Sequence, residues 1–203
     1  MQNLVRVGLC LIATFCYGET QAQAPPQPTA TYHSDAMNLD FTYPSSFAKQ
    51  GVDESAKNCV STPIAGMDMS KGFNMIFLSR FDGACIGKDV TAERDTIAVN
   101  FVNDLLKTLG KPDVSKGTDY EIGGHMASSV SGTVKLNDVK PAGTVVYGAG
   151  SCIAVSKDLV CFGFLSSDCP TLALLSVSTV KFTDTSTAPI LPSNLIRACR
   201  SGL

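Results

Sequence analysis

Cysteines are the residues of this sequence whose spacing most clearly indicates chemistry. Two of the eight, Cys10 and Cys16, lie in an apolar N-terminal segment, which leaves six in the rest of the chain. Six cysteines in a small exported domain are typical of three disulfides. Zinc sites usually contain two cysteines separated by only a few residues, and no pair here is that close, so we favour disulfides over a metal site or free thiols. The six are Cys59, Cys85, Cys152, Cys161, Cys169 and Cys199.

The elements around these cysteines favour particular pairs. Two pairs lie at the end of a predicted hairpin or across its strands, where facing residues come close enough for a bridge. The last pair would connect the C-terminal tail to the body of the domain. The sequence leaves other connectivities open, but we expect the pairs Cys59–Cys85, Cys152–Cys161 and Cys169–Cys199.

Histidine is the usual base in nucleophilic catalysis, and the sequence has only two histidines. His33 stands at the start of the predicted domain, which favours a solvated side chain. His125 follows two glycines and precedes an apolar strand, so it either ends that strand or faces a cleft. The motifs G-x-S-x-G and H-E-x-x-H and the phosphate-binding loop do not occur. We assign no catalytic residue and keep His33, Asp35 and His125 as candidates to bind a ligand.

Carboxylates gather at two places in the sequence. Asp35 and Asp40 are close to His33, and a second group precedes and enters a predicted helix. Acidic residues at a helix start stabilise the helix dipole, and we favour this role over metal binding. No metal site and no cofactor is predicted. The second group comprises Asp82, Asp89, Glu93 and Asp95.

The first residues have the three-part layout of a cleavable export signal. Arg6 precedes the apolar run 7–16, polar residues follow, and small residues stand at Ala22 and Ala24. The run is shorter than the roughly 20 residues that a membrane-spanning helix needs. We therefore expect a signal peptide over residues 1–22, cleaved after Ala22 or alternatively after Ala24. The mature bacterial protein is expected to be secreted or periplasmic, with no stable membrane span.

The remaining chain suits one domain, because domains commonly have about 100–200 residues. We expect a Pro-rich tether over residues 23–31, a folded domain over 32–183 and a Pro-punctuated tail over 184–203. Hydrophobic residues make up 44% and charged residues 17%, with a net charge of −2, which describes a foldable globule. Lys and Arg are scattered singly, so a nucleic-acid partner is not expected.

Alternating and β-branched patterns predict an antiparallel sheet. Pro63 argues for an edge position in its strand, while Gly123-Gly124 and Ser156–Asp158 predict turns. The strands are expected at residues 37–43, 59–65, 73–81, 125–134, 143–155, 159–165 and 180–182.

The clearest helix is predicted over residues 92–109. Thr91 is a suitable N-cap, and Gly110 and Pro112 end the helix. A second helix is expected over 169–177, where Pro170 suits the first turn. Apolar residues recur every fourth position along the first helix and predict the face that packs on the sheet. These residues are Ile97, Phe101, Leu105 and Leu109, with Val102 and Leu106 beside them.

This α+β order, together with the segment Leu39-Asp40-Phe41-Thr42-Tyr43-Pro44-Ser45-Ser46-Phe47, resembles the PsbP/Mog1/DcrB-like superfamily. Its members begin with a strand of the form F-x-x-x-Y-P-x-x-[FW]. The resemblance covers roughly residues 32–182. It implies an α/β/α sandwich, an antiparallel sheet flanked by helices, and a small accessory or binding module without catalytic machinery.

We therefore expect a non-enzymatic exported binding or accessory module, held together by disulfides, whose partner is a protein or a small molecule. Two alternatives stay open. One is a hydrolase or metal-dependent enzyme that uses His125 and nearby carboxylates. The other is a structural subunit of a cell-envelope assembly.

Overall fold

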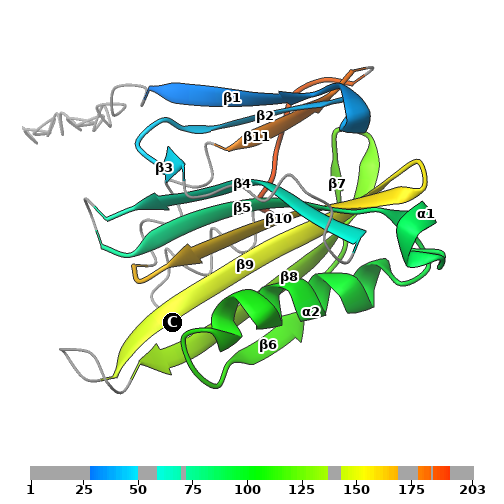
Figure 1. Cartoon of the computed structure of the whole chain (residues 1–203). Helices are drawn as coiled ribbons and strands as arrows, with labels where there is room; N and C mark the ends of the chain where they lie inside the picture. The colour runs from blue at the N-terminus through cyan, green and yellow to red at the C-terminus, as the bar shows by residue number, and fades with distance from the viewer. Residues whose placement is uncertain are drawn as a thin grey trace, which may run out of the picture.

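A computed structural model describes residues 28–49, 59–69, 72–136, 143–168, 178–183 and 185–192. These residues form an α+β fold with two antiparallel sheets (Figure 1). The predicted signal peptide, most of the predicted tether, the predicted helix over 169–177 and both Cys169 and Cys199 lie outside the described residues.

The larger sheet contains eight strands and carries most of the core. Its path is β3-β4-β5-β10-β9-β8-β6, with β7 paired to β8. All seven predicted strand segments become strands, and five of the seven lie in this sheet. Its strands are β3 (Ala48–Lys49), β4 (Val60–Asp68), β5 (Asn74–Phe81), β6 (Asp113–Lys116), β7 (Tyr120–Ile122), β8 (His125–Leu136), β9 (Thr144–Val155) and β10 (Asp158–Ser166).

Tight turns set the register of this sheet, and two of them lie where the sequence predicted turns. Gly123 and Gly124 join β7 to β8 with φ values of 54° and 81°. Two successive positive φ angles are characteristic of a type I′ hairpin turn, and glycine adopts them without steric cost. Ser156, at φ 58°, begins the turn between β9 and β10.

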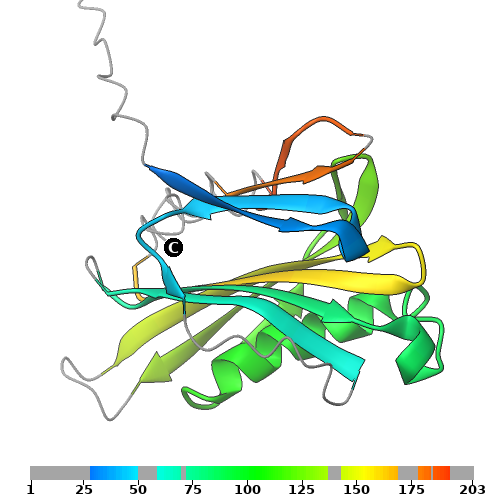
Figure 2. The ribbon, with the colours of Figure 1, turned by 45° about the horizontal axis from the view of Figure 1, so that its top comes forward.

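The smaller sheet brings together segments from both ends of the described chain. Its order is β1-β2-β11-β12, and the 3-10 helix η1 (Asp35–Met37) joins its first two strands. In Figures 1 and 2 this sheet lies over one face of the larger sheet. Its strands are β1 (Thr29–Ser34), β2 (Leu39–Pro44), β11 (Thr179–Phe182) and β12 (Ala188–Pro189).

Two boundaries differ from the sequence prediction. The chain enters the smaller sheet at Thr29, within the segment expected to be a tether. Strand β1 pairs with β2 through backbone hydrogen bonds, and its exposed residues alternate with partly buried ones. At the other end, β12 and the buried residues Ile190 and Leu191 pack onto the core although they belong to the predicted tail.

The long helix α2 (Arg94–Lys107) covers the opposite face of the larger sheet (Figures 1 and 2). It begins later than expected, and the N-cap prediction for Thr91 was wrong. The Asp89 carboxylate instead accepts hydrogen bonds from the backbone N–H groups of Thr91 and Ala92, which holds those residues in a turn before the helix. A short helix that the sequence did not predict, α1 (Gly83–Ile86), precedes this turn.

The larger sheet therefore has a different cover on each face. The helix α2 lies on one face, and the smaller sheet packs on the other through residues such as Phe41, whose ring lies 5.3 Å from that of Phe162 between centroids. Within the described residues, a sheet takes the place that a helix layer has in an α/β/α sandwich.

Two disulfides connect elements of the larger sheet, with the pairing expected from the sequence. Cys59–Cys85 links the start of β4 to α1, and Cys152–Cys161 bridges directly facing residues of β9 and β10. Cys85 is exposed, whereas Cys152 and Cys161 are fully buried beneath α2. No described helix combines the length and apolar character needed to cross a membrane.

Candidate ligand-binding site

His33, the first histidine candidate, lies between two carboxylates on the smaller sheet. Its Nδ1 atom is 2.6 Å from Asp40 Oδ1, and its Nε2 atom is 2.9 Å from Asp35 Oδ1. The hydrogen bond to Asp40 and, after it, the bond to Asp35 raise the pKa of His33 above its ordinary value of 6.5. Both ring nitrogens thus donate to carboxylates in the charged form, which leaves no ring lone pair for a metal ion.

The second candidate, His125, has a different environment. It opens β8 in the larger sheet, and its ring lies 4.3 Å from that of Phe182 between centroids. The two histidines therefore have different partners, since carboxylates flank His33 whereas His125 packs against Phe182. Across the described part of the chain, no group of three or more His, Cys, Asp and Glu side chains could hold a metal ion.

The carboxylates around the start of α2 contact nearby donors and cations. Asp82 caps α1 by accepting from the Cys85 N–H at 3.0 Å. Glu93 lies 3.6 Å from the Lys88 ammonium. These side chains satisfy donors at helix ends and pair with a nearby cation.

A network of charged side chains attaches the start of α2 to the sheet, and the sequence did not predict it. Arg94 and Lys116 both pair with Asp95 and Asp119. The buried Ser128 hydroxyl of β8 donates to Asp95 Oδ1 at 2.8 Å. Chiefly Lys116, then Ser128 and Arg94, lower the pKa of Asp95 from 3.8 to about 2, with desolvation acting in the opposite direction.

A second unpredicted polar contact involves Tyr120 of β7. Its hydroxyl donates to the Ile190 carbonyl and pairs with the hydroxyl of the buried Ser151 on β9. Burial raises the pKa of the Tyr120 hydroxyl, so the group stays protonated and remains a donor. This contact holds the segment around β12 against the larger sheet.

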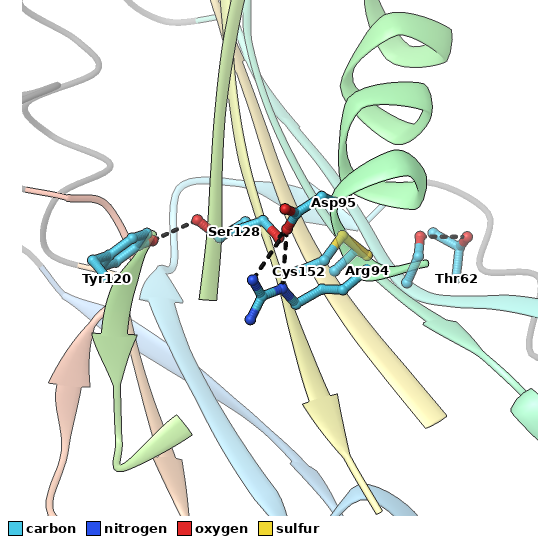
Figure 3. Close-up of a disulfide and its surroundings, with 9 residues drawn as sticks. Thr62, Arg94, Asp95, Tyr120, Ser128 and Cys152 are labelled. Carbon is cyan, nitrogen blue, oxygen red and sulfur yellow. Dashed lines mark hydrogen bonds and ion pairs between the residues drawn. A yellow bond between two sulfur atoms is a disulfide. The ribbon is translucent and has the colours of Figure 1, made fainter. Parts of the chain in front are cut away.

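A polar row crosses the larger sheet directly beneath α2. Ser79, Cys161, Cys152 and Ser128 face one another in turn across β5, β10, β9 and β8, and facing residues of antiparallel strands share one side of the sheet. The disulfide forms the centre of this row. Figure 3 shows Thr62 on one side of Cys152 and Ser128 on the other.

An apolar cavity of about 680 Å³ lies beside this row, between α2 and the strands β4, β5 and β10. We call it the α2 pocket. Phe81 and Phe101 meet edge to face across it, with ring centroids 6.2 Å apart. The sheet wall is formed by Val60, Phe73, Met75, Phe77, Phe81 and Leu165, and the helix wall by Ile97, Phe101, Leu105 and Leu109.

The position of α2 explains why this space is open. The helix lies over β8, β9 and β10, where two facing glycine pairs, Gly132–Gly148 and Gly150–Gly163, remove side chains from the sheet surface. A Cβ atom on Gly150 would lie 2.6 Å from Val102 Cγ2, and one on Gly148 would lie 2.9 Å from Leu106 Cδ1. The helix therefore sits low on these strands, and the larger side chains of β5 extend beyond its edge.

The structure divides the helix face predicted from the sequence into a deeper and a shallower part. The residues in closest contact with the sheet are Ala98, Val102 and Leu106, all at most 1% exposed. The other residues of the predicted face pack against the same core but are only partly buried, and they line the α2 pocket. These residues are Ile97, Phe101, Leu105 and Leu109.

Four polar side chains besides that of Ser79 line the α2 pocket. Asn100, Asp104 and Thr108 are exposed positions at the rim on the α2 side. Thr62, on β4, hydrogen-bonds to Ser79 in the sheet wall, with 3.0 Å between the two hydroxyl oxygens. Among the described lining residues, Asp104 is the one ionisable side chain. The sequence did not predict the pocket. Its one signal in the sequence was the width of the apolar face of α2, which is larger than the sheet contact alone requires.

Comparisons with known proteins give similar folds at low identity. No family model matches the sequence, and no curated protein is similar to it. A solution structure of cyanobacterial PsbP (CyanoP) from Synechocystis sp. PCC 6803 is 13% identical, with a TM-score of 0.46 over 70% of this chain and 82% of that one. A crystal structure of LpqN, described as involved in cell envelope biogenesis of Mycobacterium tuberculosis, is 16% identical, with a TM-score of 0.41 over 80% of this chain and 91% of that one.

The similar solved structures thus include a PsbP protein. The Leu39–Phe47 segment resembles the superfamily to which PsbP belongs. At these identities and TM-scores the likeness carries no information about a ligand. What the site can bind follows from its own side chains.

Proposed function

We propose that this protein is a non-enzymatic exported module that binds an apolar small molecule in the α2 pocket. The observation that carries the proposal is the pocket itself, a cavity of about 680 Å³ with aromatic and aliphatic side chains on both walls. Small-molecule sites typically have volumes of about 300–1,000 Å³ and apolar linings with a few polar groups.

The energetics favour an occupant in this space. Phe73, Met75 and Phe77 on the sheet and Phe101 and Leu105 on the helix remain partly exposed. Removing such surface from water stabilises a complex by roughly 25 cal/mol per Å². The helix and sheet that form the two walls are already packed, so the site needs little ordering before it binds.

Export is supported by the two disulfides. Both Cys59–Cys85 and Cys152–Cys161 are formed, and such bonds persist in oxidising compartments and are rare in the cytosol. We propose a secreted or periplasmic location on this basis and on the signal-like N-terminal sequence. An exported protein that binds a small molecule could act as a carrier, a sensor or an accessory subunit, and we propose a role of this kind.

Fluorescence of N-phenyl-1-naphthylamine, which brightens in apolar surroundings, tests the proposal. The wild-type protein should bind this probe with saturation. Ile97→Asp places a carboxylate on the helix wall of the pocket and should weaken binding at least roughly tenfold, because burying an unpaired charge is costly. Thr96→Asp is the matched control, since Thr96 is exposed on the same helix and does not line the pocket.

Circular dichroism and intact disulfides would confirm that both variants are folded. The acidic side chain also suits the first turn of α2 in each case. Equal probe binding by the wild type and Ile97→Asp would overturn the proposed site.

A further inference from the structure

We infer that the α2 pocket selects an uncharged amphipathic molecule, and that Thr62 and Ser79 bind its single polar group. The ligand class would be an apolar chain or ring system that carries one hydroxyl or ester group. This inference rests on the proposed function and adds to it the chemistry of recognition.

A β-bulge places the two hydroxyls together on the pocket wall. Ser61 faces Arg80 and Ile64 faces Leu78, so the two residues between them on β4, Thr62 and Pro63, stand opposite Ser79 alone. Proline has no N–H to give to the strand ladder, which suits it to such an irregularity. Bulges commonly redirect a side chain at functional sites, and this one brings Thr62 to Ser79 in the pocket lining.

The hydroxyl pair retains hydrogen-bonding capacity for a ligand. Each hydroxyl has one proton to donate and two lone pairs to accept. The Thr62–Ser79 hydrogen bond, at 3.0 Å, uses one proton and one lone pair. One hydroxyl proton and further lone pairs remain, in a wall where Ser79 is only 3% exposed. A ligand hydroxyl or carbonyl can therefore form a bond here that is sheltered from competing water.

Thr108, a third hydroxyl of the lining, is engaged elsewhere. Its Oγ1 donates to the Leu105 carbonyl of its own helix at 2.9 Å, so its single proton is already used. The bulge pair is thus the better anchor within the described lining.

The charge around the pocket excludes an ionised head group. No Lys, Arg or His occurs among the described lining residues to pair with a carboxylate or phosphate, and the exposed Asp104 at the rim would repel one. An ammonium group would have to reach Asp104 at the rim, away from the hydroxyl pair, or enter an apolar wall at a desolvation cost. A neutral head group meets neither obstacle.

Displacement of bound N-phenyl-1-naphthylamine by ligands with the same 12-carbon chain tests this inference. Dodecanol should displace the probe at a concentration roughly tenfold lower than dodecanoate or dodecyltrimethylammonium, because only the neutral head group avoids the cost of burying a charge. A carboxylate or ammonium ligand that binds as well as dodecanol would overturn the predicted charge selectivity.

Variants then test the anchor by comparing dodecanol with dodecane. Thr62→Val keeps the shape of the side chain and should reduce the preference for dodecanol over dodecane roughly fivefold, the size of one ordinary hydrogen bond. Thr108→Val, the same substitution at the rim, should leave that preference unchanged. Ser79→Ala provides a second anchor variant if Thr62→Val does not fold.

The outcomes separate this inference from the proposed function. If the wild type does not bind the probe, the proposed function fails and the inference with it. If the probe binds but Thr62→Val and Ser79→Ala keep the full preference for dodecanol, the pocket stands and the anchor is wrong.

Discussion

The Asp95 carboxylate contacts side chains from three elements of the fold. It contacts Arg94 on α2, Lys116 on β6 and Ser128 on β8. Its pKa of about 2, against an ordinary 3.8, means that the folded protein binds the Asp95 proton less tightly than the unfolded chain does. The associated stability is therefore present above about pH 4 and is lost as the pH falls from about 4 toward 2.

Asp95→Asn should lower the free energy of unfolding at pH 6 by about 1 kcal/mol. This figure allows for solvent screening, since 43% of the side chain is exposed. The variant should also lose part of the acid sensitivity that the wild type shows between pH 4 and pH 2, because the group that titrates there is gone. Urea unfolding at several pH values measures both effects.

Asp104→Asn is the matched control for removing a carboxylate from α2. Its side chain is exposed, and no ion pair within the described residues involves it, so its substitution should cost much less at pH 6. An Asp95→Asn variant whose unfolding curve follows that of the wild type at every pH would contradict a structural role for the network.

At the scale of elements, the glycines of the larger sheet determine how closely α2 approaches its strands. The facing glycines of β9 and β10 leave room for Val102 and Phe101 above them. Gly150→Ala would place a methyl group 2.6 Å from Val102 Cγ2 and 3.0 Å from the Phe162 carbonyl oxygen. Such overpacking typically costs about 1–3 kcal/mol, and chemical denaturation should show a loss of this size.

A double-mutant cycle isolates the helix contact in this prediction. Val102→Ala removes the methyl group that Gly150→Ala would meet, so the glycine substitution should cost less in that background. Purely additive effects of the two substitutions would show that α2 does not rest on Gly150.

Local sequence signals predicted local structure well. The strand β2, the hairpins around Gly123-Gly124 and Ser156, and the body of α2 were all found, because turn residues and helix periodicity are short-range patterns. The predicted apolar face of α2 included Val102 and Leu106, but the sequence did not show that these residues lie deeper than Phe101. The stripe that contains Val102 and the stripe that contains Phe101 are both apolar. Val102 packs more deeply because the strands beneath it, β8, β9 and β10, carry glycines, and these lie in a distant part of the sequence.

The candidate site depended even more on distant contacts. The pocket combines β5 with α2, and its hydroxyl pair combines β4 with β5 at a bulge whose residue pairing no sequence pattern reveals. His33 and His125 attracted attention as rare residue types. In the structure His33 hydrogen-bonds to carboxylates, and His125 packs against the Phe182 ring. The aromatic residues that line the pocket, by contrast, looked like ordinary core residues in the sequence.

For the whole molecule, the two disulfides differ in their access to solvent. Cys85 is exposed, whereas Cys152 and Cys161 are 0% exposed beneath α2. A thiolate must reach a sulfur atom to exchange with it, so dithiothreitol should reduce Cys59–Cys85 under native conditions at least roughly ten times faster than Cys152–Cys161. Alkylation followed by peptide mass mapping measures both rates.

The same reduction in guanidinium chloride is the control, since unfolding exposes all sulfurs and should bring the rates together. Faster native reduction of Cys152–Cys161 would contradict the buried position of that bond. Mapping of the unreduced protein also tests the Cys169–Cys199 pair, which stays a prediction.

The smaller sheet has a consequence for how the protein is made. Strand β2 pairs along Leu39–Thr42 with Thr179–Phe182 of β11, so these strands cannot pair until about 140 residues after β2 have been synthesised. Until then, Leu39 and Phe41, which are almost fully buried in the finished fold, have no β11 to cover them. During that interval β2 exposes apolar side chains that can aggregate, so we expect a chaperone that shields this strand to improve the yield of folded protein.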